Sequence, residues 1–255
     1  MDAPSPPPFG SRYPPARVPP RAFERVGRAI TRLGLRLYFG AQHVGREHIP
    51  SEGPAILVSN HPTVADPFTV AFGTPRWVSW MAFDEAFDWP FFGAVMRLYR
   101  AIPLNLERPR PSSIKAAYGT LARGRVLGLF FEGERSHDDG LNRPLKPGAA
   151  RMAIRTGATL VPVTISGARR VWPRQQRLPR PGKIVVRYHP PVDPRAFRPE
   201  LPLKERSRLL TEELARIVAS ALPPDGAPWL DRSAVRPDRS RPRAPDAPPG
   251  GDLSR

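Results

Sequence analysis

The chain has 255 residues, enough for one domain with a sizeable hydrophobic core. It contains no cysteine, which excludes disulfides, thiolate nucleophiles and thiolate metal sites, and it has no run of about 18 apolar residues that would predict a transmembrane helix. Its net charge of +17 predicts attraction to polyanions such as nucleic acid, anionic lipid headgroups or acidic carrier proteins.

The two ends of the chain are rich in proline. Residues 1–21 and residues 223–255 each hold eight of the 36 prolines and lack apolar periodicity. Such segments cannot bury enough surface to offset the entropy lost on ordering, so we expect disordered tails. The N-terminal tail also lacks the apolar segment of a secretory signal. The predicted folded unit is a single domain over residues 22–222.

The first predicted element is an amphipathic helix over residues 22–40. On a helical wheel its apolar side chains share an arc of about 80°, and its arginines lie opposite. The apolar residues are Phe23, Val26, Ile30, Leu33 and Leu37, and the arginines are Arg25, Arg28, Arg32 and Arg36. Two interpretations remain open. The apolar stripe packs on the domain core, or the helix lies in the interface of an anionic membrane.

Strands and helices alternate in the rest of the domain. Apolar runs predict strands at residues 55–59, 77–82, 126–131, 159–165 and 183–189. Helices are predicted at residues 67–72, 113–123, 148–156 and 203–221. The first of these helices has Asp66 as its expected N-cap and Pro67 at the first helical position. This alternation predicts an α/β fold with a mixed, largely parallel sheet flanked by helices.

A histidine and an aspartate follow the strand at residues 55–59. His61 lies on the loop at the carboxyl end of that strand, where open α/β sheets place their ligands. Asp66 follows five residues later, so its carboxylate can accept one ring N–H and leave the other nitrogen as a general base. No serine nucleophile is needed if the substrate supplies the hydroxyl. The alternative is that both residues only cap local backbone, since this spacing is common by chance.

A second polar segment follows the strand at residues 126–131. Residues 130–136 read Phe-Phe-Glu-Gly-Glu-Arg-Ser and leave a strand at its carboxyl end, so they can face His61. Gly133 allows a ligand to approach the backbone closely, and Arg135 offers a planar fork for a phosphate or carboxylate. The alternative is an ordinary strand-to-loop exit with a solvated Glu-Arg pair.

Together these blocks resemble the glycerolipid acyltransferases, the family of bacterial 1-acyl-glycerol-3-phosphate acyltransferases. Asn60-His61 with Asp66, the segment 130–136, and Val161-Pro162-Val163 look like motifs I, III and IV of that family. Arg100 begins a segment, residues 100–105, that looks like motif II. The order and spacing also fit, and the resemblance covers residues 49–191. It implies the same α/β fold.

The resemblance implies a mechanism and a set of substrates. His61 would act as general base on an acceptor hydroxyl and Asp66 would orient it. The residues expected to bind substrate are Asn60, Arg100, Glu132, Gly133 and Arg135. The acyl group would pass from acyl-CoA or acyl carrier protein to a lysophosphatidic-acid-type acceptor, with no cofactor and no metal. The enzyme would act as a peripheral protein at the cytoplasmic face of an anionic membrane. The oxyanion donors are left open between backbone near Gly133 and motif IV.

The chain departs from the family pattern at four positions. Leu106 stands where motif II commonly ends in a basic residue, and Phe83 stands where another basic residue is common. In motif III, Phe131 replaces the usual proline and Glu134 the usual threonine. The cations that remain are Arg135, with Arg100, Arg108 and Lys146 as helpers. An acceptor lysolipid without the usual phosphate contact is therefore an alternative.

Three other function classes compete with acyl transfer. A nucleic-acid-binding module would need a basic, aromatic-interleaved motif, and we find none in the sequence. A metal-dependent phosphohydrolase built on His61 and Asp66 would need further ligands, and the whole chain has five histidines. A scaffold without catalysis is disfavoured because His61 and Asp66 are both present.

Overall fold

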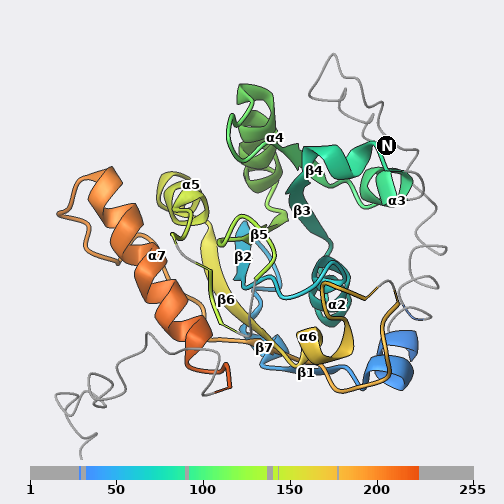
Figure 1. The fold of residues 1–255 in the computed structure, drawn as a ribbon. Helices are drawn as coiled ribbons and strands as arrows, with labels where there is room; N and C mark the ends of the chain where they lie inside the picture. The colour runs from blue at the N-terminus through green and yellow to red at the C-terminus, as the bar shows by residue number, and fades with distance from the viewer. Residues whose placement is uncertain are drawn as a thin grey trace, which may run out of the picture.

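A computed structural model describes residues 29, 33–89, 92–136, 140–142, 144–176 and 178–223 of the chain (Figure 1). The predicted tails, except for Pro223, and most of the predicted helix over residues 22–40 lie outside this part of the chain.

A seven-stranded sheet of order β1-β7-β6-β2-β5-β3-β4 forms the centre of the described structure. Its strands are β1 (Gln42–Val44), β2 (Ala55–Ser59), β3 (Val78–Phe83), β4 (Ile102–Leu104), β5 (Val126–Phe130), β6 (Thr159–Ser166) and β7 (Val185–Tyr188). Strands β6, β2, β5, β3 and β4 run parallel, while β7 is antiparallel to β6 and parallel to β1. Because β2 lies in the parallel block, the loops after β2 and β5 leave the sheet at the same edge.

Helices cover both faces of the sheet (Figure 1). The helices are α2 (Asp66–Gly73), α3 (Phe92–Leu98), α4 (Pro111–Ala122), α5 (Gly148–Thr156), α6 (Ala168–Val171) and α7 (Leu203–Ala219), with 3-10 turns η1 (Arg46–His48) and η2 (Asp84–Phe87). Ile56 and Val58 of β2 pack in one core cluster with α4, α5 and α7, and Ala55 and Leu57 pack in the other with α2 and α6. Burial on both faces explains why β2 is a continuous apolar run.

The predicted α/β class is confirmed, and the long elements lie within a few residues of their predicted bounds. The three-residue strands β1 and β4 and the helices α3 and α6 were not predicted, because each is short or carries a weak apolar pattern. The predicted N-cap was wrong. Helix α2 begins at Asp66 itself and has Ala65 as its N-cap. The Asp66 carboxylate points back to Thr63 instead of to the backbone of its own helix.

The described end of the N-terminal helix exposes apolar side chains. Residues 33–39 are helical, and Leu35 is the buried residue of this segment, packed with Ala41 and Phe72. Leu33 and Leu37 of the predicted stripe are 57% and 75% exposed. The interpretation that the apolar stripe packs on the core is therefore wrong for Leu33 and Leu37. The other members of the stripe lie outside the described residues. In the described part of the chain, no helix is long and apolar enough to span a membrane.

Candidate active site

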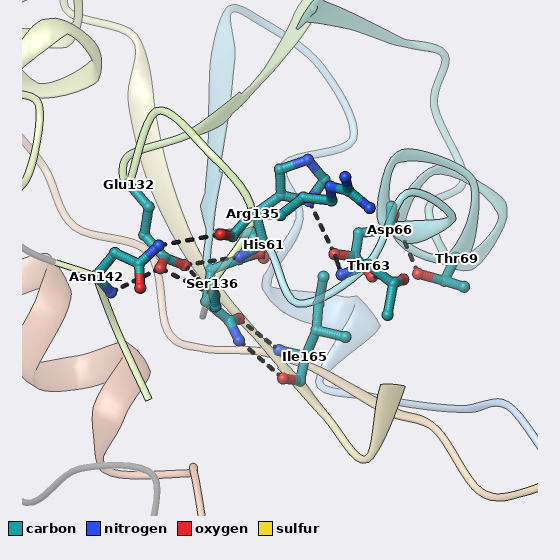
Figure 2. A network of polar contacts seen from close by, with 11 residues as sticks. His61, Thr63, Asp66, Thr69, Glu132, Arg135, Ser136, Asn142 and Ile165 are labelled. Carbon is teal, nitrogen blue, oxygen red and sulfur yellow. Dashed lines mark hydrogen bonds and ion pairs between the residues drawn. The ribbon is translucent and has the colours of Figure 1, made fainter. Parts of the chain in front are cut away.

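Sheet register brings the two sequence motifs together. Ser59 at the end of β2 pairs with Phe130 at the end of β5. His61 and Glu132 each lie two residues beyond this pair, so they leave the sheet at the same level. The His61 backbone N–H donates to Glu132 Oε1 over 2.8 Å (Figure 2). The segments of motifs I and III therefore form one site at the carboxyl edge of the sheet.

His61 and Asp66 form a hydrogen-bonded pair. His61 Nδ1 lies 2.9 Å from Asp66 Oδ2 (Figure 2). Because a carboxylate only accepts, the proton on this ring is assigned to Nδ1, which leaves Nε2 with a free lone pair. Nε2 has no hydrogen-bond partner among the described residues. The His61 side chain keeps 18% of its surface exposed, whereas that of Asp66 is fully buried. The pair thus presents a base to solvent and hides its orienting carboxylate.

Thr63 holds the Asp66 carboxylate in place. The Thr63 backbone N–H donates to Asp66 Oδ2 and its hydroxyl donates to Oδ1, each over 2.6 Å. With His61, three donors fix the carboxylate in one orientation. This local turn is why five residues of separation are enough to align the imidazole.

An aromatic stack supports the other side of the imidazole. The Phe130 ring lies parallel to His61 with centroids 3.8 Å apart, and Trp80 stacks on Phe130 at 4.6 Å. Trp80 in turn lies over Gly128, where an added Cβ would come within 2.6 Å of the indole. The ring of His61 is therefore fixed by a carboxylate at one nitrogen and by Phe130 on one face.

Glu132 is buried under the loop that carries His61. It is 4% exposed, and besides His61 it accepts hydrogen bonds from the Asn142 backbone N–H at 2.7 Å and the Ser136 hydroxyl at 2.9 Å. Burial raises the pKa of Glu132 to about 7, and the hydrogen bonds from Asn142, His61 and Ser136 oppose that rise. The structure thus surrounds this carboxylate with protein donors.

Two cations border the site. Arg135 is partly buried, and burial lowers the pKa of its guanidinium, as does Arg174, while Asp66 opposes this effect. Lys146 is exposed, and its side chain runs over Gly133, 3.4 Å from where a Cβ would stand. Gly133 has a φ of +82°, a left-handed conformation that favours glycine, and its N–H donates to Phe130 O.

Three of the five expected substrate-binding residues do not face an open position beside His61. Glu132 and Asn60 are buried, and Arg100 lies at another edge of the sheet. Asn60 is 2% exposed, and its side-chain amide makes two hydrogen bonds to the backbone of Ile165, at 2.8 and 2.9 Å. It therefore holds β2 to β6 instead of facing solvent. Arg100 is exposed in the turn before β4, so it lies on the amino side of that strand rather than at the carboxyl edge with His61.

Sequence reasoning missed the residues that support the site. Thr63, Ser136 and Asn142 hold the loops around His61 and Glu132 through backbone, hydroxyl or side-chain amide groups. Thr63 and Ser136 fall inside the recognised motifs, so their hydroxyls were a usable signal. Asn142 donates its backbone N–H, a group that every residue except proline carries, to Glu132, and its side-chain amide donates to the Arg135 carbonyl over 3.1 Å.

Comparison with known proteins gives consistent matches. The family model described as Acyltransferase matches residues 41–166. A 1-acyl-sn-glycerol-3-phosphate acyltransferase of Bacillus subtilis is 30% identical over 181 residues, which are 71% of this chain and 87% of the relative. The chloroplastic enzyme LPAT1 of Arabidopsis thaliana is 30% identical over 152 residues, but this chain spans only 42% of its length. The crystal structure of the LPA acyltransferase PlsC from Thermotoga maritima aligns with a TM-score of 0.63 at 26% identity, covering 78% of this chain and 80% of that one.

Proposed function

Because this chain belongs to the PlsC-type family of glycerolipid O-acyltransferases, we propose that it transfers a fatty acyl group to the free hydroxyl of 1-acyl-glycerol-3-phosphate. The acyl donor in this proposal is a thioester, either acyl-CoA or the acylated form of acyl carrier protein. The observation that carries the proposal is the pair of His61 and Asp66, whose free ring nitrogen lies at the carboxyl edge of the sheet.

The reaction follows from the free nitrogen of His61. Nε2 takes the proton of the acceptor hydroxyl as its oxygen attacks the thioester carbonyl carbon, and the C–O bond forms. The tetrahedral intermediate then collapses, the C–S bond breaks, and the imidazolium returns the proton to the leaving thiolate. Asp66 stabilises the imidazolium between these steps. A thiol is a good leaving group, so the scheme includes no metal and no cofactor.

We propose that Arg135 and Lys146 bind the acceptor phosphate. Both lie on or against the segment that follows β5, and both are at least partly exposed. A guanidinium can bind phosphate oxygens through two parallel N–H donors, and an ammonium adds a second charge. Asn60 and Arg100 are left out of this part of the proposal because of the positions described above.

The membrane contact is proposed to be a surface made by two distant segments. Tyr38 donates its hydroxyl to Pro179 O over 3.0 Å, which joins the N-terminal helix to the loop between α6 and β7. The exposed side chains of Leu33, Leu37, Tyr38 and Leu178 lie on these two segments. Exposed basic residues in the same segments are Arg36, Arg180 and Lys183. Apolar and basic groups together fit an anionic lipid surface, which in this proposal is the cytoplasmic face of the membrane.

An acceptor panel tests the proposed function. Purified protein is mixed with a radiolabelled donor, either acyl-CoA or acylated acyl carrier protein. The acceptor is lysophosphatidic acid, lysophosphatidylcholine or lysophosphatidylglycerol, and the lipid products are resolved. We expect labelled phosphatidic acid from lysophosphatidic acid and none with His61→Ala. A product only from another lysolipid would favour the alternative acceptor, which the partly exposed apolar Leu106 beside Gly133 supports. No transfer with any acceptor would refute the proposal.

A further inference from the structure

We infer that Glu132 is a positioning residue that fixes the main chain of His61 and does not contact the substrate. The inference deepens the proposed function and rests on it. Glu132 is 4% exposed, so a ligand outside the protein has almost no access to its carboxylate.

Both carboxylate oxygens of Glu132 already have protein donors. Oε1 accepts the His61 backbone N–H at 2.8 Å, and Oε2 accepts the Asn142 backbone N–H at 2.7 Å. The Ser136 hydroxyl lies 2.9 Å from each oxygen. A buried carboxylate is tolerated where such donors replace its water, so the contacts account for this residue without a substrate.

The same loop also holds the other backbone group of His61. The Ser136 N–H donates to the His61 carbonyl over 2.8 Å. The residue that bears the proposed base is thus tied at its N–H by Glu132 and at its C=O by Ser136 (Figure 2). Asp66 and Phe130 then fix only the ring.

This arrangement has a kinetic consequence. A group that positions the base affects the chemical step, whereas a group that binds the acceptor affects its affinity. A misplacement of about 1 Å costs on the order of 100-fold in rate. Loss of the Glu132 contact is therefore expected to lower kcat and to leave KM little changed.

The test compares Glu132→Gln, Glu132→Asp and Glu205→Gln. Glu132→Gln keeps one acceptor oxygen for two backbone donors and turns its NH₂ toward the other, which disturbs the loop. We expect kcat to fall about 100-fold with KM for the acceptor changed less than about threefold. Glu132→Asp keeps the charge but withdraws it from His61, and we expect about a tenfold fall in kcat. Glu205→Gln is the matched control, because this exposed carboxylate lies in α7 and not on the segment after β5, and the charge change is the same. It should leave both constants unchanged.

Two outcomes would overturn the inference. One is a rise in KM of tenfold or more with kcat retained, in either Glu132 variant. The other is wild-type kcat in a folded Glu132 variant. If Glu132→Gln does not fold, Glu132→Asp decides alone.

A measurement without turnover separates this inference from the proposed function. In ¹⁵N-histidine-labelled protein, the His61 backbone amide should resonate downfield and exchange slowly in the wild type, and it should lose both properties in Glu132→Asp. An unchanged His61 amide would refute the contact, even if the wild type transferred no acyl group to any lysolipid.

Discussion

At the scale of single residues, the chemistry depends on which nitrogen of His61 faces the substrate. The bond to Asp66 Oδ2 places the proton on Nδ1 and leaves Nε2 as the proposed base. Thr63 donates to both oxygens of the carboxylate, so Asp66 has little freedom to turn. Small changes in this carboxylate are therefore expected to have large effects on rate.

Replacing Asp66 by asparagine tests its orienting role. An amide NH₂ cannot accept the Nδ1–H bond, so the imidazole can adopt the wrong tautomer, and we expect kcat to fall about 10³- to 10⁴-fold. KM for the acceptor should change little. Steady-state kinetics with Asp193→Asn, an exposed aspartate, as control would check this. A rate within a few-fold of the wild type would show that Asp66 only shapes the turn.

Arg135→Ala tests the proposed phosphate contact. Hydrogen bonds to charged groups contribute about 1.5–3 kcal/mol, so KM for lysophosphatidic acid should rise about 10- to 100-fold. The exposed Arg155 in α5 provides the control Arg155→Ala. An acceptor without a phosphate monoester should be less affected. Equal losses for both acceptors would contradict a phosphate-specific role.

At the scale of elements, β5 links core packing to the site. Its Phe130 stacks on His61, and its Gly128 makes room for the Trp80 indole, which stacks on Phe130. The stack therefore runs from the proposed base into the core between β5 and β3. Substitutions that disturb packing in β5 should therefore displace the imidazole of His61, because the stacked rings connect the two.

Gly128→Ala is expected to destabilise the fold. The new Cβ would lie 2.6 Å from the Trp80 ring, and overpacking of this kind costs about 1–3 kcal/mol. Gly148→Ala is the matched control, because no atom lies within 4 Å of its added Cβ. Urea unfolding of both variants measures the difference. Equal stability of Gly128→Ala and the wild type would show that the indole shifts at no cost.

At the scale of the whole molecule, buried titratable groups link stability to pH. Burial lowers the pKa of His189 to about 4, with Arg187 and His48 adding to the effect. Its Nε2 lies 2.8 Å from Thr164 Oγ1, which in turn donates to Val218 O of α7. The unfolded chain takes up this proton below about pH 6.5, so the contribution of His189 to stability is lost as pH falls toward 4. Glu132 acts in the opposite sense, because its raised pKa makes the folded state hold a proton that the unfolded state releases between about pH 4.5 and 7.

The contribution of His189 can be isolated with His189→Gln. Glu132 is common to both proteins, so its effect cancels in the difference between them. We expect the free energy of unfolding of the wild type to fall more steeply than that of the variant between about pH 6.5 and pH 4. Chemical denaturation across this range measures the two slopes. Parallel curves would mean that His189 titrates alike in both states.

The exposed Leu33 and Leu37 offer a test of the proposed membrane contact. We expect the double variant Leu33→Ser, Leu37→Ser to bind anionic vesicles more weakly while keeping its stability, because both side chains lie outside the core. Wild-type binding should increase with anionic lipid content and weaken with salt. Vesicle co-sedimentation at two salt concentrations, with neutral vesicles as control, measures this. Equal partitioning to neutral vesicles would refute the electrostatic part.

The order of the elements and the pair of His61 and Asp66 were predictable from the sequence because they depend on near neighbours. Apolar periodicity marks a long strand or helix within its own residues, and a five-residue turn needs only local backbone to join the imidazole to the carboxylate. The short edge strands β1 and β4 lack such a pattern, since three residues are too few to show a periodic alternation of apolar and polar side chains.

Only the tertiary structure decided where Asn60, Glu132 and Arg100 lie relative to His61. Asn60 finds Ile165 across 105 positions of sequence, and Glu132 finds the His61 N–H across 71. Such contacts depend on strand order and on the register of Ser59 with Phe130, which no single segment encodes. A polar residue in a motif therefore indicates that it belongs to the site. Burial and the neighbouring strands determine whether its side chain faces the substrate or holds the loop.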